Sequence, residues 1–290
     1  MGKIAFIYPG QGAQKAGMGK DFYETYPEAK QVYELADKVL DFDIKKICFE
    51  ENEDINKTEY TQPALVTTCL AITECLKNKG IKPDVTAGLS LGEYAAIATA
   101  GGMKNEDAIS TVRKRGIYMS NAVPQGEGTM VAVLGMTAEE VASVVEDIPG
   151  ISVANYNCPG QVVITGKKAM APLAADKLTQ AGAKRTIELN VSGPFHSPFL
   201  TGAGEQLRKE LDEVNFSKLT VPYVTNVDAT YVENIEDTPQ LLQKQVSSSV
   251  MWEQSVRNMI AQGVDTFIEI GPGKTLAGFM KKIDRSVKMI

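Results

Sequence analysis

Apolar and polar residues follow two different periods along this chain, and these periods predict its elements. Short apolar runs that end at glycine or proline indicate buried strands, as at 4–8 (IAFIY) and 266–270 (TFIEI). Apolar residues spaced three and four apart indicate helices, as at 61–79. Expected strands alternate with expected helices in the first and last parts of the chain. This alternation is typical of an α/β fold with a mainly parallel sheet.

These outer parts have expected strands at 4–8, 85–87, 220–226 and 266–270. Their expected helices are 22–40, 61–79, 91–100, 105–119, 197–211, 239–246, 253–262 and 274–283.

The middle of the chain has a different pattern, which begins at the glycine- and proline-rich stretch 123–128 (VPQGEG). The order of expected elements after it is β-α-β-β-α-β, the ferredoxin-like pattern. The expected elements are strands at 129–134, 151–155, 161–165 and 184–191, and helices at 137–146 and 168–180. We therefore expect an inserted ferredoxin-like subdomain at 124–196, and a large domain built from 1–123 and 197–290.

Composition narrows the class of protein. The 290 residues are 43% hydrophobic and 23% charged, an ordinary globular mixture that excludes a disordered chain. The net charge is −6, with no dense basic stripe, so we expect no nucleic-acid partner. No uncharged apolar run reaches the roughly 18 residues of a membrane span, so we expect no membrane partner.

The cysteines and the histidine bear on metal sites and on location. The four cysteines form no CxxC pair, and the chain has a single histidine, so we expect no metal site. Thiols of this kind are typical of a reducing compartment, which predicts a cytoplasmic protein.

The stretch Gly88-Leu89-Ser90-Leu91-Gly92 matches the pattern GxSxG between an expected strand and an expected helix. This strand–turn–helix arrangement is the nucleophile elbow of serine enzymes. It exposes the serine hydroxyl at a helix N-terminus, where backbone N–H groups favour negative charge. The alternative is a tight turn in which Ser90 only caps the helix.

A serine needs a base to remove its proton, and His196 is the only histidine. It lies between Pro194 and Pro198, in a rigid loop where the chain leaves the expected insertion. Junctions between domains form clefts, which favours a catalytic role over a structural one. We find no convincing third carboxylate for a triad: among the acidic residues between Ser90 and His196, Glu139, Asp147 and Asp176 have no special setting, and Glu188 is on a strand.

Arg115 falls inside the apolar stripe of helix 105–119, which Ala108, Val112 and Met119 also occupy. A buried guanidinium needs an anionic partner. That partner is either a core carboxylate in a structural ion pair or a carboxylate on the substrate, which the planar guanidinium binds through two hydrogen bonds.

Several motifs together resemble the malonyl-CoA:acyl-carrier-protein transacylase family, and they span nearly the whole chain. In order they are YPGQGAQKAGMG at the start, TQPALVTT at 61–68, GLSLGEYAA around Ser90, RKRG ending at Gly116, NYNCPGQVVITG at 155–166, GPFHSP around His196 and FIEIGPGKTL near the end. The resemblance implies an α/β-hydrolase-like large domain with an inserted ferredoxin-like domain. It implies that Ser90 is the nucleophile, that His196 is the base and that Arg115 binds the malonyl carboxylate.

The resemblance also implies roles for the backbone. The N–H groups of Gln11 and Leu91 would form the oxyanion hole, and a main-chain carbonyl near Met251 would orient the histidine in place of an acid. The chain departs from the family at two positions. Leu89 replaces the usual histidine before the nucleophile, and Met251 replaces the usual Gln or Arg before Trp252.

The implied activity is transfer of a malonyl group from malonyl-CoA to the phosphopantetheine thiol of acyl carrier protein, through an acyl-serine, in fatty acid synthesis. It needs no cofactor. One rival is a thioesterase or esterase on the same elbow, which a buried Arg115 argues against. The other is a scaffold with an inert elbow.

Two further expectations concern substrates. Phe195 should crowd a 2-methyl branch on the acyl group and so favour malonyl over methylmalonyl. The acidic carrier should need a local basic patch on this net negative chain. The expected patch is Lys184, Arg185, Lys281, Lys282 and Arg285.

Overall fold

The computed structural model describes residues 2–191 and 193–290. The first part of the chain forms β1 (Lys3–Tyr8), α1 (Lys20–Thr25), α2 (Pro27–Val39), α3 (Ile44–Phe49), η1 (Asp54–Asn56), α4 (Thr58–Asn78), β2 (Val85–Gly88), α5 (Gly92–Thr99) and α6 (Asn105–Ser120). The middle part forms β3 (Gly128–Leu134), α7 (Ala138–Glu146), β4 (Ile151–Cys158), β5 (Gln161–Lys167), η2 (Lys168–Met170), α8 (Ala171–Gln180) and β6 (Arg185–Glu188). The last part forms η3 (Pro198–Leu200), α9 (Thr201–Asp212), β7 (Tyr223–Val224), β8 (Tyr231–Val232), η4 (Ile235–Asp237), α10 (Thr238–Gln245), α11 (Trp252–Ala261), β9 (Val264–Glu269), α12 (Thr275–Ile283) and β10 (Lys288–Met289).

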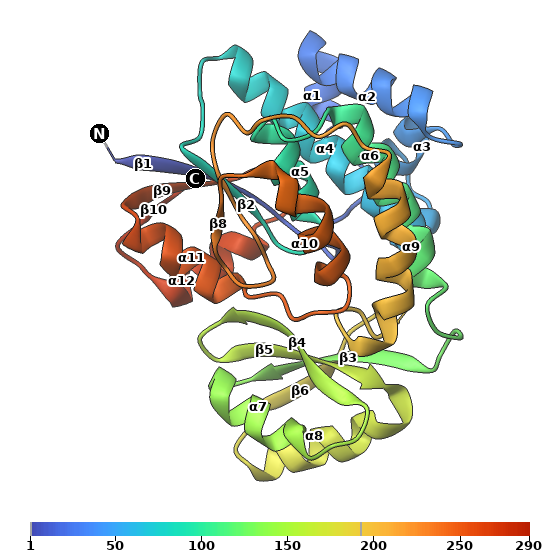
Figure 1. The fold of residues 1–290 in the computed structure, drawn as a ribbon, viewed down its shortest axis with the longest axis vertical. Helices are drawn as coiled ribbons and strands as arrows, with labels where there is room; N and C mark the ends of the chain where they lie inside the picture. The colour runs from blue at the N-terminus through green and yellow to red at the C-terminus, as the bar shows by residue number, and fades with distance from the viewer. Residues whose placement is uncertain (1, 192) are drawn as a thin grey trace.

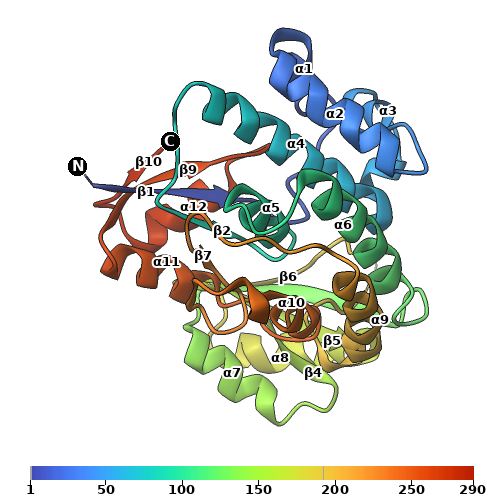
Figure 2. The ribbon, with the colours of Figure 1, turned by 45° about the horizontal axis from the view of Figure 1, so that its top comes forward.

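The strands of the described residues form two sheets, which Figures 1 and 2 show with the helices around them. The larger sheet has the order β10-β9-β1-β2-β7-β8, and its strands pair in parallel except β7 with β8. The smaller sheet is antiparallel, with the order β4-β5-β3-β6. The fold is thus α/β with a mainly parallel sheet and a separate antiparallel sheet. Among the described residues, no helix is long and apolar enough to cross a membrane.

Strand β1 lies inside the larger sheet and buries both of its faces. Phe6 and Tyr8 point into one core, which helices α4, α5 and α6 cover. Ala5 and Ile7 point into a second core, which α11 and α12 cover. Successive side chains on a strand point to opposite faces, so a strand with helices on both sides reads as a continuous apolar run. This explains the sequence IAFIY.

The smaller sheet packs one face on its own helices and the other on the rest of the molecule (Figure 1). Val131 and Val133 of β3 join the core beneath α7 and α8. Met130 and Ala132, on the opposite face, join the core of the larger part. Two backbone hydrogen bonds also connect β4 to Val250: Tyr156 N–H to Val250 O (2.9 Å) and Val250 N–H to Ala154 O (2.8 Å).

The element boundaries differ from the expected ones in a few places. The expected helix 22–40 is two helices, because Tyr26 is extended and Pro27 starts α2 at a position that suits proline. Helix α3 and strands β8 and β10 were not expected. The expected strands 184–191 and 220–226 are shorter and correspond to β6 and β7.

Candidate active site

Ser90 lies in the turn between β2 and α5, with a backbone φ of +51° that is rare for a residue with a side chain. The flanking glycines are required by close backbone packing. A Cβ on Gly88 would lie 1.9 Å from the carbonyl carbon of Gly92, and a Cβ on Gly92 would lie 2.3 Å from the carbonyl oxygen of Tyr8. The pattern GxSxG here is therefore a steric requirement of a strained turn.

Asn226, in the loop after β7, holds this turn in place. Its Oδ1 accepts a hydrogen bond from the Ser90 N–H at 2.6 Å, and its Nδ2 donates to the Gly88 carbonyl oxygen at 2.7 Å. The Asn226 side chain is buried, so these bonds are shielded from water. The side chain of Asn226, 136 residues after Ser90 in the sequence, thus fixes the backbone on both sides of Leu89.

His196 lies beside Ser90, and the distance from its Nε2 to Ser90 Oγ is 2.7 Å. Its backbone φ is +58°, a strained value, in a loop between two prolines. Its Nδ1 is 2.9 Å from the backbone carbonyl oxygen of Gln245. A carbonyl can only accept, so Nδ1 carries the proton and Nε2 of the neutral ring accepts from the Ser90 hydroxyl. This is the arrangement of a nucleophile and its base.

The expectation that Met251 supplies the orienting carbonyl is wrong. Gln245, at the end of α10, supplies it instead. Met251 caps the start of α11; its N–H donates to Asn226 O, and its carbonyl accepts the Ser255 hydroxyl at 2.8 Å and the Ser255 N–H at 2.9 Å. The carbonyl of Met251 is therefore committed to its own helix.

Burial, together with the positive charge of Arg115, lowers the pKa of His196 to about 4, and the backbone hydrogen bonds of Gln245 and Ser248 oppose this shift. A buried imidazolium beside a guanidinium is doubly disfavoured. The ring is therefore neutral at pH 7 and able to accept a proton.

Arg115 is almost completely buried, with 1% of its surface exposed, as its place on the apolar stripe of α6 predicts. Its Nη1 donates to Gln62 Oε1 at 2.9 Å. Its Nη2 donates to Gln245 Oε1 at 3.0 Å and to Ser90 Oγ at 3.1 Å. Within the described residues no carboxylate lies in ion-pair contact with Arg115, so the structural ion pair considered from the sequence does not form directly.

These groups open into a cavity of about 220 Å³ between the two sheets. Ser90, His196 and Arg115 line it, together with Gln11 and Leu91, whose backbone N–H groups are the expected oxyanion donors. The smaller sheet contributes Met130, Asn155, Asn157 and Val163, and Phe195 and Leu89 also line the cavity.

Three polar residues of the site were not found from the sequence. Asn226 and Gln245 lie in ordinary polar surroundings that give no signal. Glu93 does carry a sequence signal, because it is the only charged residue in the otherwise apolar stretch 91–100 (LGEYAAIATA). A helix that is apolar all round is buried, so a carboxylate within it is buried too. All of α5 is indeed buried, including Glu93.

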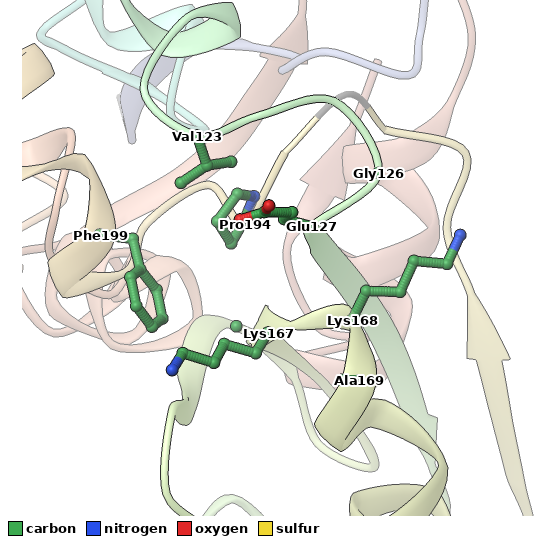
Figure 3. Close-up of a pocket in the computed structure, with 9 residues that line it drawn as sticks. Val123, Gly126, Glu127, Lys167, Lys168, Ala169, Pro194 and Phe199 are labelled. Atoms are coloured by element: carbon green, nitrogen blue, oxygen red, sulfur yellow. The ribbon is translucent and has the colours of Figure 1, made fainter.

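A second cavity, of about 430 Å³, lies where the chain passes between the two parts (Figure 3). Lys167 and Lys168 extend in different directions at its edge, and Lys167 Nζ lies 5.9 Å from the ring centre of Phe199. None of the described residues that line it is a serine, a cysteine or a histidine. Ser90, His196 and Arg115 therefore line the cavity of about 220 Å³ and not this one.

Comparisons with known proteins agree with this geometry. The model of the acyl transferase domain matches residues 5–289. A Bacillus subtilis protein called malonyl CoA-acyl carrier protein transacylase is 46% identical over 100% of this chain and 93% of its own. A crystal structure of the Clostridium perfringens transacylase of the same name is 42% identical, with a TM-score of 0.96, over 99% of this chain and 92% of that one. A malonyl-transacylase solved in complex with its type II PKS acyl-carrier protein is 35% identical, with a TM-score of 0.96, over 99% and 94% of the two chains. The chain, in which His196 and the buried Arg115 both contact the Ser90 hydroxyl, therefore belongs to the acyl transferase domain family.

Proposed function

We propose that this protein transfers the malonyl group of malonyl-CoA to the phosphopantetheine thiol of acyl carrier protein through an acyl-Ser90 intermediate. The observation that carries the proposal is the meeting of His196 Nε2 and Arg115 Nη2 at Ser90 Oγ, 2.7 and 3.1 Å away. A base beside the hydroxyl serves any acyl transfer. A buried guanidinium that no carboxylate contacts directly selects an acyl group that carries a carboxylate. The names of the relatives agree.

In the first half-reaction, the malonyl carboxylate binds Arg115 and offsets its charge. This removes one of the two causes that disfavour a protonated His196. Ser90 Oγ attacks the thioester carbonyl carbon while its proton moves to His196 Nε2. The N–H groups of Gln11 and Leu91 stabilise the oxyanion, an effect of about 3–4 kcal/mol per donor in other enzymes. The C–S bond then breaks, and the departing sulfur takes the proton from His196.

The second half-reaction reverses these steps with a different thiol. The phosphopantetheine thiol of the carrier gives its proton to His196, and its sulfur attacks the acyl-serine. The C–O bond breaks, and Ser90 regains its proton. One thioester replaces another, so the overall equilibrium lies near unity.

The proposal extends to the architecture and setting. Segments 1–123 and 197–290 form an α/β-hydrolase-like domain, and 124–196 form an inserted ferredoxin-like subdomain. The element order β-α-β-β-α-β and the sheet order β4-β5-β3-β6 support the second assignment. The reaction belongs to fatty acid synthesis in the cytoplasm, and the four cysteines, all free and buried, agree with a reducing compartment.

Mass spectrometry of the protein after exposure to malonyl-CoA tests the proposal. We expect a malonyl adduct on Ser90 that persists in water and disappears when holo-acyl carrier protein is added. An adduct that water removes as quickly as the carrier does would favour the thioesterase reading. An unmodified Ser90 would favour an inert scaffold.

Alanine variants of Gln245 and Met251 test whether the side chain of each residue contributes to malonyl transfer. Gln245→Ala keeps the backbone carbonyl that orients His196 but removes the amide that bonds Arg115, the Ser90 carbonyl and Glu93. Each lost buried hydrogen bond costs about 1–3 kcal/mol, so we expect malonyl transfer to slow roughly 10- to 100-fold. Met251→Ala should stay within about twofold of the unmodified protein. Equal losses in the two variants, measured as initial rates of acyl-serine formation, would contradict these roles.

The basic patch proposed for the carrier consists of Lys184, Arg185, Lys281, Lys282 and Arg285. All five side chains are exposed. The patch has one part on the smaller sheet (Lys184, Arg185) and one at the end of α12 (Lys281, Lys282, Arg285), and both parts lie near the turn after β4. Burial raises the pKa of Cys158, at the end of β4, and the positive charge of Lys282 opposes this rise. Lys184 lies close to Gly135, whose N–H donates to the carbonyl oxygen of Gly160 in that turn. Helix α12 also lines the cavity through Phe279.

Reversing the charge of all five residues should raise the KM for the carrier at least tenfold and flatten its dependence on salt. The KM for malonyl-CoA in the first half-reaction is the internal control for a folded site. If the carrier KM and its salt dependence do not change, the carrier docks elsewhere.

A further inference from the structure

Glu93 is a buried carboxylate next to the catalytic groups that the mechanism above does not use. It lies in the first turn of α5, three residues after Ser90, and none of its surface is exposed. A buried carboxylate is costly, so its presence calls for a reason.

The contacts of Glu93 are unequal for its two oxygens. Oε2 accepts hydrogen bonds from Gln245 Nε2 at 2.7 Å and from the Asn226 N–H at 3.2 Å. Oε1 is buried and has no hydrogen-bond partner among the described residues. The same Gln245 amide accepts Arg115 Nη2 through its Oε1 at 3.0 Å. Glu93 and Arg115 are therefore joined through one amide and do not touch.

This separation matters for the guanidinium. A carboxylate in direct contact would occupy N–H donors at the edge of the guanidinium that a substrate carboxylate needs. With no carboxylate at all, the buried charge of Arg115 would be uncompensated in the free protein. A carboxylate held one amide away offsets the charge without taking an N–H donor of Arg115 directly, and Arg115 Nε has no hydrogen-bond partner among the described residues.

We propose that Glu93 is a positioning residue that supplies the counter-charge of Arg115 through Gln245, so that the guanidinium can both take up and release a substrate carboxylate. This inference rests on the proposed malonyl transfer. Glu93 and the malonyl carboxylate then compete for one buried cation. The competition weakens malonyl binding, which suits a reaction whose acyl product must leave again.

The competition makes malonyl binding depend on pH. Burial raises the pKa of Glu93 to about 7, against the lowering effects of Gln245, the Asn226 N–H, Thr225 and the charge of Arg115. Tyr94 on the same helix and Tyr223 on β7 also face it, and burial raises the pKa of both well above the physiological range. The pKa of His196 is about 4. Of these groups, only Glu93 changes charge between pH 6 and 8.5.

The affinity for malonyl-CoA should fall as Glu93 becomes ionised. Below pH 7 Glu93 is protonated and neutral, and the malonyl carboxylate meets an uncontested Arg115. Above pH 7 Glu93 is ionised and opposes it. Malonyl-CoA should therefore bind more tightly at pH 6 than at pH 8.5, with proton uptake near pH 7. Acetyl-CoA has no carboxylate on its acyl group and serves as the matched ligand, because it shares the phosphates of coenzyme A.

Calorimetry on Ser90→Ala protein tests this without acyl transfer. At pH 8.5, adding Glu93→Gln should tighten malonyl-CoA binding roughly tenfold, as expected when one of two neighbouring like charges is removed inside a protein. At pH 6 the two proteins should bind malonyl-CoA equally, and acetyl-CoA should stay within twofold throughout. Glu210→Gln is the control: it removes a partly buried carboxylate of α9 that bonds Lys114 and Tyr118.

Unchanged malonyl-CoA binding in Glu93→Gln at pH 8.5, or an equal change for acetyl-CoA, would overturn the proposal. If Glu93→Gln does not fold, the Ser90→Ala protein decides alone. Its ratio of acetyl-CoA to malonyl-CoA dissociation constants must fall from pH 6 to 8.5 with a midpoint near 7, and a flat ratio refutes the role of Glu93. Acylation of Ser90 in the unmodified protein, measured in parallel, shows separately whether malonyl transfer itself holds.

Discussion

Ser90→Ala should abolish formation of the acyl-enzyme, and His196→Ala should slow it by roughly 10⁴-fold or more. The first variant removes the atom that forms the covalent bond. The second leaves the hydroxyl without a base, because the chain has no other histidine and the nearby groups, Arg115 and the amide of Gln245, cannot accept its proton. Rapid-quench labelling with malonyl-CoA, read as the mass of the Ser90 peptide, measures both effects.

The control for these variants is stability, since both positions have strained backbones with positive φ. Alanine carries a Cβ as serine and histidine do, so the backbone strain is similar in the variants. We therefore expect the thermal unfolding temperature to change little. A His196→Ala protein that acylated at the rate of the unmodified protein would eliminate His196 as the base.

Arg115→Ala should have the second largest effect, a loss of malonyl transfer by several hundredfold together with a narrowed or reversed preference for malonyl over acetyl. In the unmodified protein, acetyl-CoA brings no carboxylate to the buried Arg115 and so lacks the charge-assisted hydrogen bonds that the malonyl group makes with the guanidinium. The variant has no charge to satisfy. Competition among malonyl-, methylmalonyl- and acetyl-CoA, read as acyl-Ser90 by mass, measures the preference directly.

The methylmalonyl ester tests the cavity wall in the same experiment. Phe195 lines the cavity and is 95% buried, so its ring has little room to move. We expect malonyl over methylmalonyl by roughly 10- to 100-fold, the usual range for one methyl group. Equal labelling by acetyl- and malonyl-CoA in the unmodified protein would show that Arg115 does not recognise the acyl group.

The sequence predicted the placement of Ser90, His196 and Arg115 because each carries a local signal. Gly88 and Gly92 flank Ser90 for steric reasons, two prolines bracket His196, and Arg115 breaks an apolar stripe. Gln245 could not be found in this way. Its role depends on where the end of α10 meets a loop 49 residues earlier in the chain, and its backbone carbonyl is a group that every residue has.

The fold shows the same division between local and non-local information. The run IAFIY predicted a buried strand, and β1 is buried between helices on both faces. The pairing of β2 with β7 and the placement of Asn226 beside Ser90 join segments more than 130 residues apart. Neither contact has a periodic pattern in the sequence, since such contacts follow from the packing of the whole molecule.

The way the smaller sheet is attached has a consequence for protein engineering. The hydrogen bonds between β4 and Val250 involve only main-chain atoms, so they do not depend on which side chains the sheet carries. One wall of the catalytic cavity, with Met130, Asn155, Asn157 and Val163, belongs to this sheet, whereas Ser90, Arg115 and His196 lie outside it. We therefore expect residues 128–188 to be exchangeable with the matching segment of a relative, provided that the side chains that pack into the larger core, such as Met130 and Ala132, are kept. Chimeras that receive this segment from relatives would gain a different wall of this cavity while keeping Ser90, His196 and Arg115.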